Sequence, residues 1–156
     1  GWLDDGVPDD ATLMQALRES DMRAEDAWLA EQLQQFRQML ELPGVREALV
    51  RPTTAAGATC ELWRERPFAV HLDNRLLRGT FDRVIVTREG NRTVHARLID
   101  FKTDRIDTPE AIAAAVDIYR PQIDAYRRAL QTMLQLPADR VQAQLLFLET
   151  GQLVTC

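Results

Sequence analysis

Two neighbouring stretches with the alternating pattern of β-strands constrain the fold of this chain more than any other feature. They span residues 76–86 and 93–102, and a Glu-Gly-Asn sequence at residues 89–91 lies between them. A short connection that contains glycine between two such stretches is typical of a β-hairpin. We therefore predict two adjacent strands, joined by a tight turn, in the middle of the sequence.

Three charged side chains lie where this hairpin would bring its strands together. Asp100 and Lys102 are at the end of the second strand, and Asp82 is on the first. Residues two apart on a strand share a face, so Asp100 and Lys102 point the same way, and Asp82 can lie beside them on the neighbouring strand. We predict that two carboxylates and an ammonium group converge at one end of a sheet.

The length and composition are those of one globular domain. A chain of 156 residues, 46% of them hydrophobic and 28% charged, can bury a sizeable core. No apolar stretch approaches the roughly 20 residues of a membrane-spanning helix. Two cysteines, Cys60 and Cys156, are too few for a disulfide framework or a four-cysteine metal site. We predict a cytoplasmic protein without membrane contact and, because the sequence starts at Gly1 rather than methionine, a fragment of a longer chain.

The first third of the chain is predicted to be helical. Residues 11–19 form a short helix and residues 24–42 a longer one, which Pro43-Gly44 ends. Residues 45–50 add a further turn or two. The longer helix carries a single apolar stripe, with spacings of four, three and four, formed by Leu29, Leu33, Phe36 and Leu40.

A further strand should precede the hairpin. Residues 59–64 have a β-like pattern that continues at residues 68–72, beyond Pro67. Proline cannot donate a hydrogen bond to a sheet, so Pro67 indicates an edge strand or a bulge.

The last third predicts helices followed by a strand. Thr108-Pro109 is typical of a helix start, with the threonine as N-cap and the proline at the first position. Pro121 should break this helix or restart it as a second one that runs to about Leu134. Residues 140–149 alternate in the manner of a strand.

The order of these elements predicts an α/β domain. Helices flank a central mixed β-sheet, because strands precede and follow a helical crossover. We predict that residues 1–58 are an N-terminal helical segment that packs on a core formed by residues 59–156.

The predicted cluster suits the chemistry of phosphodiester hydrolysis. Hard divalent cations prefer oxygen ligands, and the carboxylates of Asp82 and Asp100 with the carbonyl of Phe101 could hold Mg²⁺ or Mn²⁺. Lys102 could hold the attacking water or stabilise negative charge on the scissile phosphate. An Asp-x-Lys triplet by itself is common, and a surface salt bridge at a strand end would explain it equally well.

A second cluster could contact nucleic acid. Gln122 and Tyr126 lie four residues apart on one helix face, where they could bind phosphate or stack on a base. A half-buried Tyr126 in the core is the alternative. Several arginines could form a DNA-facing side or only a solvated surface: Arg75, Arg78, Arg83, Arg88, Arg92, Arg97, Arg120, Arg127 and Arg128. The net charge of −5 argues against a self-sufficient nucleic-acid binder.

Four motifs taken together resemble a known family. Gly-Thr-Phe-Asp-Arg-Val at 79–84, Leu-Ile-Asp-Phe-Lys-Thr at 98–103 and Tyr-Arg-Pro-Gln-Ile-Asp-Ala-Tyr at 119–126 follow Glu-Arg-Pro-Phe at 65–68. In order and spacing they are similar to the nuclease domain of RecB- and AddA-type helicase–nucleases, in the PD-(D/E)XK superfamily. The similarity covers about residues 61–147.

This resemblance implies a restriction-endonuclease-like core and a role for each matched residue. Asp82 and Asp100, with the Phe101 carbonyl, would bind the metal, and Lys102 would be the catalytic lysine. The family's Q-x-x-x-Y motif, which contacts DNA, would be Gln122 and Tyr126. Glu65 would be an accessory catalytic acid.

The resemblance also implies a setting. The chain would be the nuclease module of a helicase–nuclease that processes DNA double-strand breaks for recombinational repair, with a covalently linked helicase region and a second helicase–nuclease subunit as partners. The family has a metal-binding histidine on an upstream helix, whereas the two histidines here, His71 and His95, lie within the predicted strands. This departure keeps open the alternative of a catalytically inactive DNA-binding or scaffolding module.

Overall fold

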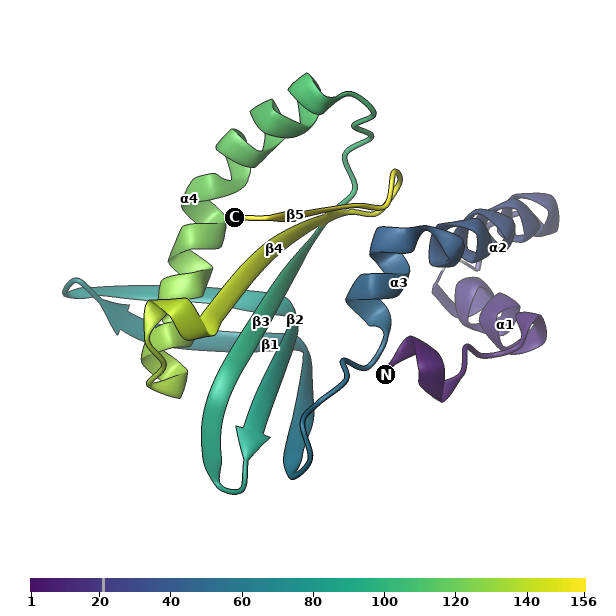
Figure 1. Cartoon of the computed structure of the whole chain (residues 1–156). Helices are drawn as coiled ribbons and strands as arrows, with labels where there is room; N and C mark the ends of the chain where they lie inside the picture. Colours follow the sequence, from purple (N-terminus) through teal and green to yellow (C-terminus); the bar gives the residue numbers. More distant parts are fainter. Residues whose placement is uncertain (21) are drawn as a thin grey trace.

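The computed structural model describes residues 1–20 and 22–156 (Figure 1). Within these residues, five strands form one sheet in the order β1-β2-β3-β4-β5. The β3–β4 pair is parallel and the other pairs are antiparallel, so the predicted mixed sheet is confirmed. The strands are β1 (Ala58–Leu72), β2 (Arg75–Glu89), β3 (Arg92–Lys102), β4 (Val141–Phe147) and β5 (Gln152–Thr155).

Helices cover both faces of this sheet. The long helix α4 (Pro109–Leu134) packs on the face that carries Leu98 and Leu145, and the short helix α3 (Pro43–Leu49) packs on the face of Ile99 and Leu146. Consecutive strand residues thus contribute to different hydrophobic clusters, as the alternation of a pleated strand requires. The flanked sheet confirms the predicted α/β class.

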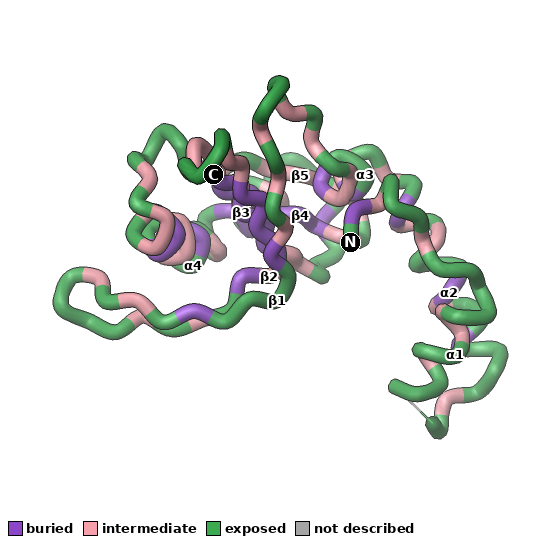
Figure 2. Tube along the Cα trace, turned by 90° about the horizontal axis from the view of Figure 1, so that it is seen from below, coloured by how far each residue is buried: buried purple, intermediate pink, exposed green. Residues whose placement is uncertain are grey.

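The first two helices extend away from the sheet. Figure 2 shows α1 (Asp10–Ser20) and α2 (Asp26–Glu41) to one side, and α1 has no buried residue. The predicted apolar stripe on α2 buries three leucines, but Phe36 keeps 37% of its surface exposed. Pro43 does not only end the preceding helix, as expected, but also begins α3 as its first residue. A proline at the first position of a helix costs no backbone hydrogen bond, because an N–H there would have no partner within the helix.

The hairpin of β1 and β2 bends sharply in its middle. The backbone of Glu65 adopts a φ of 43°, while the antiparallel register is retained from Arg64↔Arg83 to Arg66↔Phe81. Trp63 and Phe68 pack in the same cluster although five positions separate them, so the strand changes face at the bend. β1 is an edge strand, as Pro67 predicted, but the irregular residue is Glu65, two positions earlier.

α4 differs from its prediction because it continues through Pro121. Thr108 caps the helix as expected, accepting a hydrogen bond from the Ala111 N–H at 3.2 Å. Figure 1 shows one curved helix where two were expected. Proline removes a single backbone donor and bends a helix. Buried residues on both sides of it, such as Val116 and Ile123, hold α4 against the sheet across the bend.

Candidate active site

Asp100 and Lys102 form a buried ion pair at the end of β3. Both side chains lie on the α4 face of the sheet, continuing the row of Leu98, and Asp100 is only 3% exposed. The ammonium nitrogen of Lys102 lies 2.7 Å from Oδ2 of Asp100. The alternative of a solvent-exposed salt bridge at a strand end does not describe this pair, which is largely withdrawn from solvent.

Asp82 is held beside Asp100 by the backbone of the neighbouring strand. The β2–β3 register ends at Arg83↔Ile99, and one step further Asp82 stands opposite Asp100. The Phe101 N–H donates to Oδ2 of Asp82 at 2.7 Å. The carboxylate thus takes a hydrogen bond from the strand end, which fixes Asp82 next to the buried ion pair.

The surroundings of Asp100 disfavour its charged form. Burial raises the pKa of its carboxyl group above the ordinary 3.8, the Lys102 ammonium counteracts this, and the negative charge of Asp82 raises the pKa further. Oδ2 of Asp100 is the atom in contact with the Lys102 ammonium, and no other donor among the described residues reaches it. A buried carboxylate beside a second carboxylate is suited to bind a divalent cation in addition to the ammonium.

Lys102 is positioned by three groups. Its ammonium donates to Oε1 of Gln122 at 2.9 Å and lies 4.0 Å from the centre of the Tyr119 ring, in addition to its contact with Asp100. The Tyr119 hydroxyl donates to Asp104 at 2.7 Å. Tyr119 lies within the matched motif, yet no role was predicted for it. Asp104 lies in the connection between β3 and α4, close to Tyr119 in sequence, and this proximity was the sequence signal for the contact between them.

Tyr126 connects this cluster to the aromatic core. The Gln122 amide donates to its hydroxyl at 3.4 Å, and its ring meets Phe68 and Phe81 edge-on, with centroids 5.3 and 5.7 Å apart. A Cβ on Gly79 would lie 2.9 Å from the Phe68 ring and 3.0 Å from the Tyr126 hydroxyl. Gly79 therefore makes room for these rings rather than for a ligand, and Tyr126 is half-buried.

Glu65 lies on the other side of Asp82. An open hollow of about 270 Å³ is lined by Glu65, Asp82 and Phe101, together with Leu49, Arg64 and Arg83. Glu65 is exposed at the bend of β1, at the position facing Asp82 across the β1–β2 pair. The structure thus brings the predicted residues into two adjoining groups. Lys102 links Asp100 to Gln122 and Tyr126, and Asp82 links Asp100 to the hollow with Glu65 and Phe101.

Two of the expected DNA-facing arginines are instead structural. Arg83 is 3% exposed and donates to the carbonyls of Ala48, Leu49 and Gly1 at 3.1–3.2 Å. Burial, with the positive charges of Arg64 and Arg97, lowers its pKa to about 10. Arg97 bonds to Gln144 and Glu47. Both arginines share the Ile85 and Ile99 face, and both faces of these strands are apolar, so alternation alone did not distinguish them from exposed arginines.

The side chains at the site fit a hard divalent ion only as an incomplete ligand set. Within residues 1–20 and 22–156, no group of three or more histidine, cysteine, aspartate or glutamate side chains is placed to hold a metal. The available side-chain ligands are the carboxylates of Asp82 and Asp100, and Oδ2 of Asp100 is also in contact with the Lys102 ammonium. Mg²⁺ commonly uses one or two carboxylates and keeps several waters, so this set is chemically suitable.

The comparisons with known proteins agree with this geometry at the level of the family. Across the part of the chain that the structure describes, no helix is long and apolar enough to span a bilayer. A search of curated proteins gave no match. The family model of the PD-(D/E)XK nuclease superfamily matches residues 3–155, and it includes every side chain of the two groups around Asp82. The match covers nearly the full length of the chain, and the mixed sheet brings Asp82, Asp100 and Lys102 together at a strand end. The chain therefore belongs to the PD-(D/E)XK nuclease superfamily.

Proposed function

We propose that the chain is a Mg²⁺- or Mn²⁺-dependent deoxyribonuclease module that hydrolyses phosphodiester bonds. The observation that carries this proposal is the convergence of Asp82, Asp100 and Lys102, in which the buried Asp100 carboxylate lies beside the charge of Asp82 and 2.7 Å from the Lys102 ammonium. Two neighbouring carboxylates, one of them desolvated, and a lysine have the charges that phosphate chemistry requires.

Each residue has a distinct role in this proposal. Asp82 and Asp100, with the Phe101 carbonyl, would hold the cation, which when bound supplies positive charge for the phosphate and acidifies a water. Lys102, fixed between Asp100 and Gln122, orients that water or stabilises charge on the scissile phosphate. Gln122 holds the ammonium through Oε1, and Tyr126 holds the Gln122 amide. Glu65 acts as an accessory acid from the adjoining hollow.

The biological setting follows from the resemblance of the four motifs. We infer a RecB- or AddA-like helicase–nuclease that processes DNA double-strand breaks for recombinational repair in the cytoplasm. A covalently linked helicase region would deliver the DNA, and a second helicase–nuclease subunit would complete the machine. Delivery of the DNA by the helicase would also compensate for a low DNA affinity of the chain itself, because its net charge of −5 does not favour independent DNA binding.

A catalytically inactive DNA-binding or scaffolding module is the second candidate. The small ligand set favours it, because no third acidic or histidine side chain among the described residues is placed to hold a metal together with the two carboxylates. The two candidates differ in a single observable, which is cleavage of DNA in the presence of Mg²⁺ or Mn²⁺.

Replacement of Lys102 tests the proposal. Lys102→Ala should lower the rate of cleavage of labelled duplex DNA on the order of a hundredfold or more, because a preorganised charge that acts in the transition state is lost. DNA binding should persist. Arg140→Ala removes one exposed positive charge just before β4, at the end of the parallel β3–β4 pair away from Lys102, and should leave the rate unchanged. Undiminished cleavage by Lys102→Ala would exclude this lysine from the mechanism, and a wild type that binds but does not cleave would favour the inactive module.

A further inference from the structure

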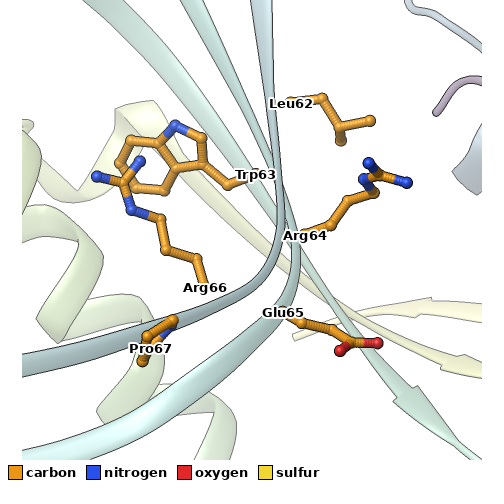
Figure 3. A pocket seen from close by; sticks show the side chains of 6 residues that line it. All are labelled: Leu62, Trp63, Arg64, Glu65, Arg66 and Pro67. Atoms are coloured by element: carbon orange, nitrogen blue, oxygen red, sulfur yellow. The ribbon is translucent and has the colours of Figure 1, made fainter.

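A second hollow adjoins the candidate active site at the free edge of the sheet. It has a volume of about 680 Å³ and is lined by residues 62–67 of β1, around the bend. Arg64 and Glu65 line both this hollow and the one that contains Asp82 and Phe101. Figure 3 shows Trp63 and Arg66 on one side of the strand and Arg64 and Glu65 on the other. A molecule that occupies the active site could therefore continue across this edge.

Arg66 forms a flat platform in this second hollow. Its guanidinium lies 3.7 Å from the centroid of the Trp63 ring, so one face of the guanidinium covers the indole (Figure 3). The indole N–H donates to Glu61 at 2.6 Å, and Glu61 also accepts from Arg88 at 3.1 and 3.2 Å. These bonds fix the ring beneath the guanidinium, and a fixed guanidinium loses little conformational freedom when a second planar group stacks on it.

The charges of the platform are available to a ligand. Arg66 and Arg64 are both exposed, and neither belongs to an ion pair of the described residues, although most other arginines here pair with a carboxylate. Arg64 also lies close enough to the buried Arg83 to lower its pKa. Arg66 and Arg64 lie on opposite sides of the strand, and the charge of Arg66 also acts on the Glu61 carboxylate, so the free edge presents one cation on each side to an anionic polymer that crosses it.

We propose that this hollow is a nucleotide-binding subsite that positions the substrate strand next to the active site. A base stacks on the outer face of the Arg66 guanidinium, and Arg64 binds a neighbouring phosphate. Guanidinium planes stack with bases, and arginine is suited to phosphate, so one strand segment satisfies both groups. This inference rests on the proposed function, because it assumes that the chain engages DNA.

The test measures binding separately from cleavage. Fluorescence anisotropy of a short fluorescein-labelled oligodeoxynucleotide, with EDTA present, reports the affinity of the purified protein. Arg66→Ala should weaken binding on the order of tenfold, the size expected for loss of one stacked base. Arg66→Lys keeps the charge but lacks the plane, and should weaken binding nearly as much. Arg64→Ala should lower the slope of log affinity against log salt by about one.

Arg140→Ala is the matched control, since it removes one exposed arginine just before β4, at the end of the parallel β3–β4 pair away from Lys102, and should bind as the wild type does. Circular dichroism melting should show that all four variants fold. Wild-type affinity in Arg66→Ala, or its restoration by Arg66→Lys, would overturn the stacking platform.

The two proposals fail in different ways. If Lys102→Ala abolishes cleavage while Arg66→Ala binds normally, the subsite is wrong and the nuclease stands. If Arg66→Ala and Arg66→Lys both weaken binding while the wild type does not cleave with Mg²⁺ or Mn²⁺, the subsite stands and the nuclease is wrong. A wild type that neither binds the oligodeoxynucleotide nor cleaves DNA with Mg²⁺ or Mn²⁺ overturns both.

Discussion

At the scale of single residues, the site depends on the carboxyl group of Asp100. Its environment raises its pKa, so between pH 3.8 and that raised pKa the folded protein binds more protons than the unfolded chain. Stability contributed by this group is therefore lost as the pH rises through the raised pKa, above which the ionised carboxylate destabilises the metal-free fold. A bound cation reverses this effect because it favours the charged form.

Metal binding should follow the same titration. Two carboxylates make an incomplete ligand set, so calorimetry with Mg²⁺ or Mn²⁺ should show weak uptake that strengthens as the pH rises through the pKa of Asp100 and releases protons below it. Asp82→Ala and Asp100→Asn should abolish the uptake. Asp139→Asn, an exposed acid in the α4–β4 connection, is the control. Equal uptake by the Asp82 and Asp100 variants would mean that the ligands are other groups.

At the scale of elements, α4 determines where Gln122 and Tyr126 lie. The helix continues through Pro121, and Gln122 is the residue that follows it. Proline inside a helix is about 3 kcal/mol less favourable than alanine. The bend therefore persists at the expense of stability, and it sets the direction from which Gln122 approaches Lys102.

Pro121→Ala should increase stability and reduce cleavage. The variant should unfold at higher urea concentration, with the free energy of unfolding increased by about 1–3 kcal/mol, because a backbone hydrogen bond is restored. Cleavage should fall, because a straighter α4 moves Gln122 away from the ammonium. Ile118→Ala, at an exposed position one turn earlier, should change neither quantity appreciably. A variant that is destabilised would show that the bend is required by packing.

At the scale of the whole molecule, Arg83 connects the N-terminal segment to the sheet. It lies next to Asp82 in sequence, donates to three carbonyls of residues 1–49, and stands 5.0 Å from the ring centroid of Trp2. The first 50 residues thus meet the sheet close to the active site, whereas α1 and α2 extend away from it.

Arg83→Met tests whether Arg83 holds the N-terminal segment on the sheet. Methionine is similar in length but leaves three carbonyls without a donor, so the free energy of unfolding in urea should fall on the order of 3 kcal/mol. Limited proteolysis should then cut first within residues 1–50. Arg92→Ala, at the exposed start of β3, should change the free energy by less than about 0.5 kcal/mol. Unchanged stability in Arg83→Met would mean that the segment is held by apolar contacts alone.

The sequence predicted the parts of the fold that local pattern determines. Strand alternation and the Gly90 turn located β2 and β3, and Thr108 located the start of α4. Alternation also brought Asp100 and Lys102 to one face. The bend at Glu65 was missed, because a positive φ at a glutamate is imposed by packing between distant segments and has no local signal.

The errors at the remaining positions share a physical cause. Pro121 was expected to end a helix, but buried residues on both sides outweigh the local penalty. Arg83 was assigned to a charged surface because arginine is seldom buried, and its three carbonyl partners belong to residues far away in the sequence. The contacts of Tyr119 with Lys102 and Asp104 depend on how α4 docks, which the sequence does not specify.

The mixed sheet has a consequence for the order in which the molecule assembles. Tight turns at Asp73-Asn74 and Gly90-Asn91 connect β1, β2 and β3, so these strands can pair soon after synthesis. The parallel β3–β4 pair must wait for the whole crossover that contains α4. Asp82 and Asp100 therefore meet early, whereas Lys102 gains Gln122 only when that crossover closes. A growing chain would hold its acidic groups together well before its lysine is fixed, so hydrolytic competence would be among the last properties acquired during folding.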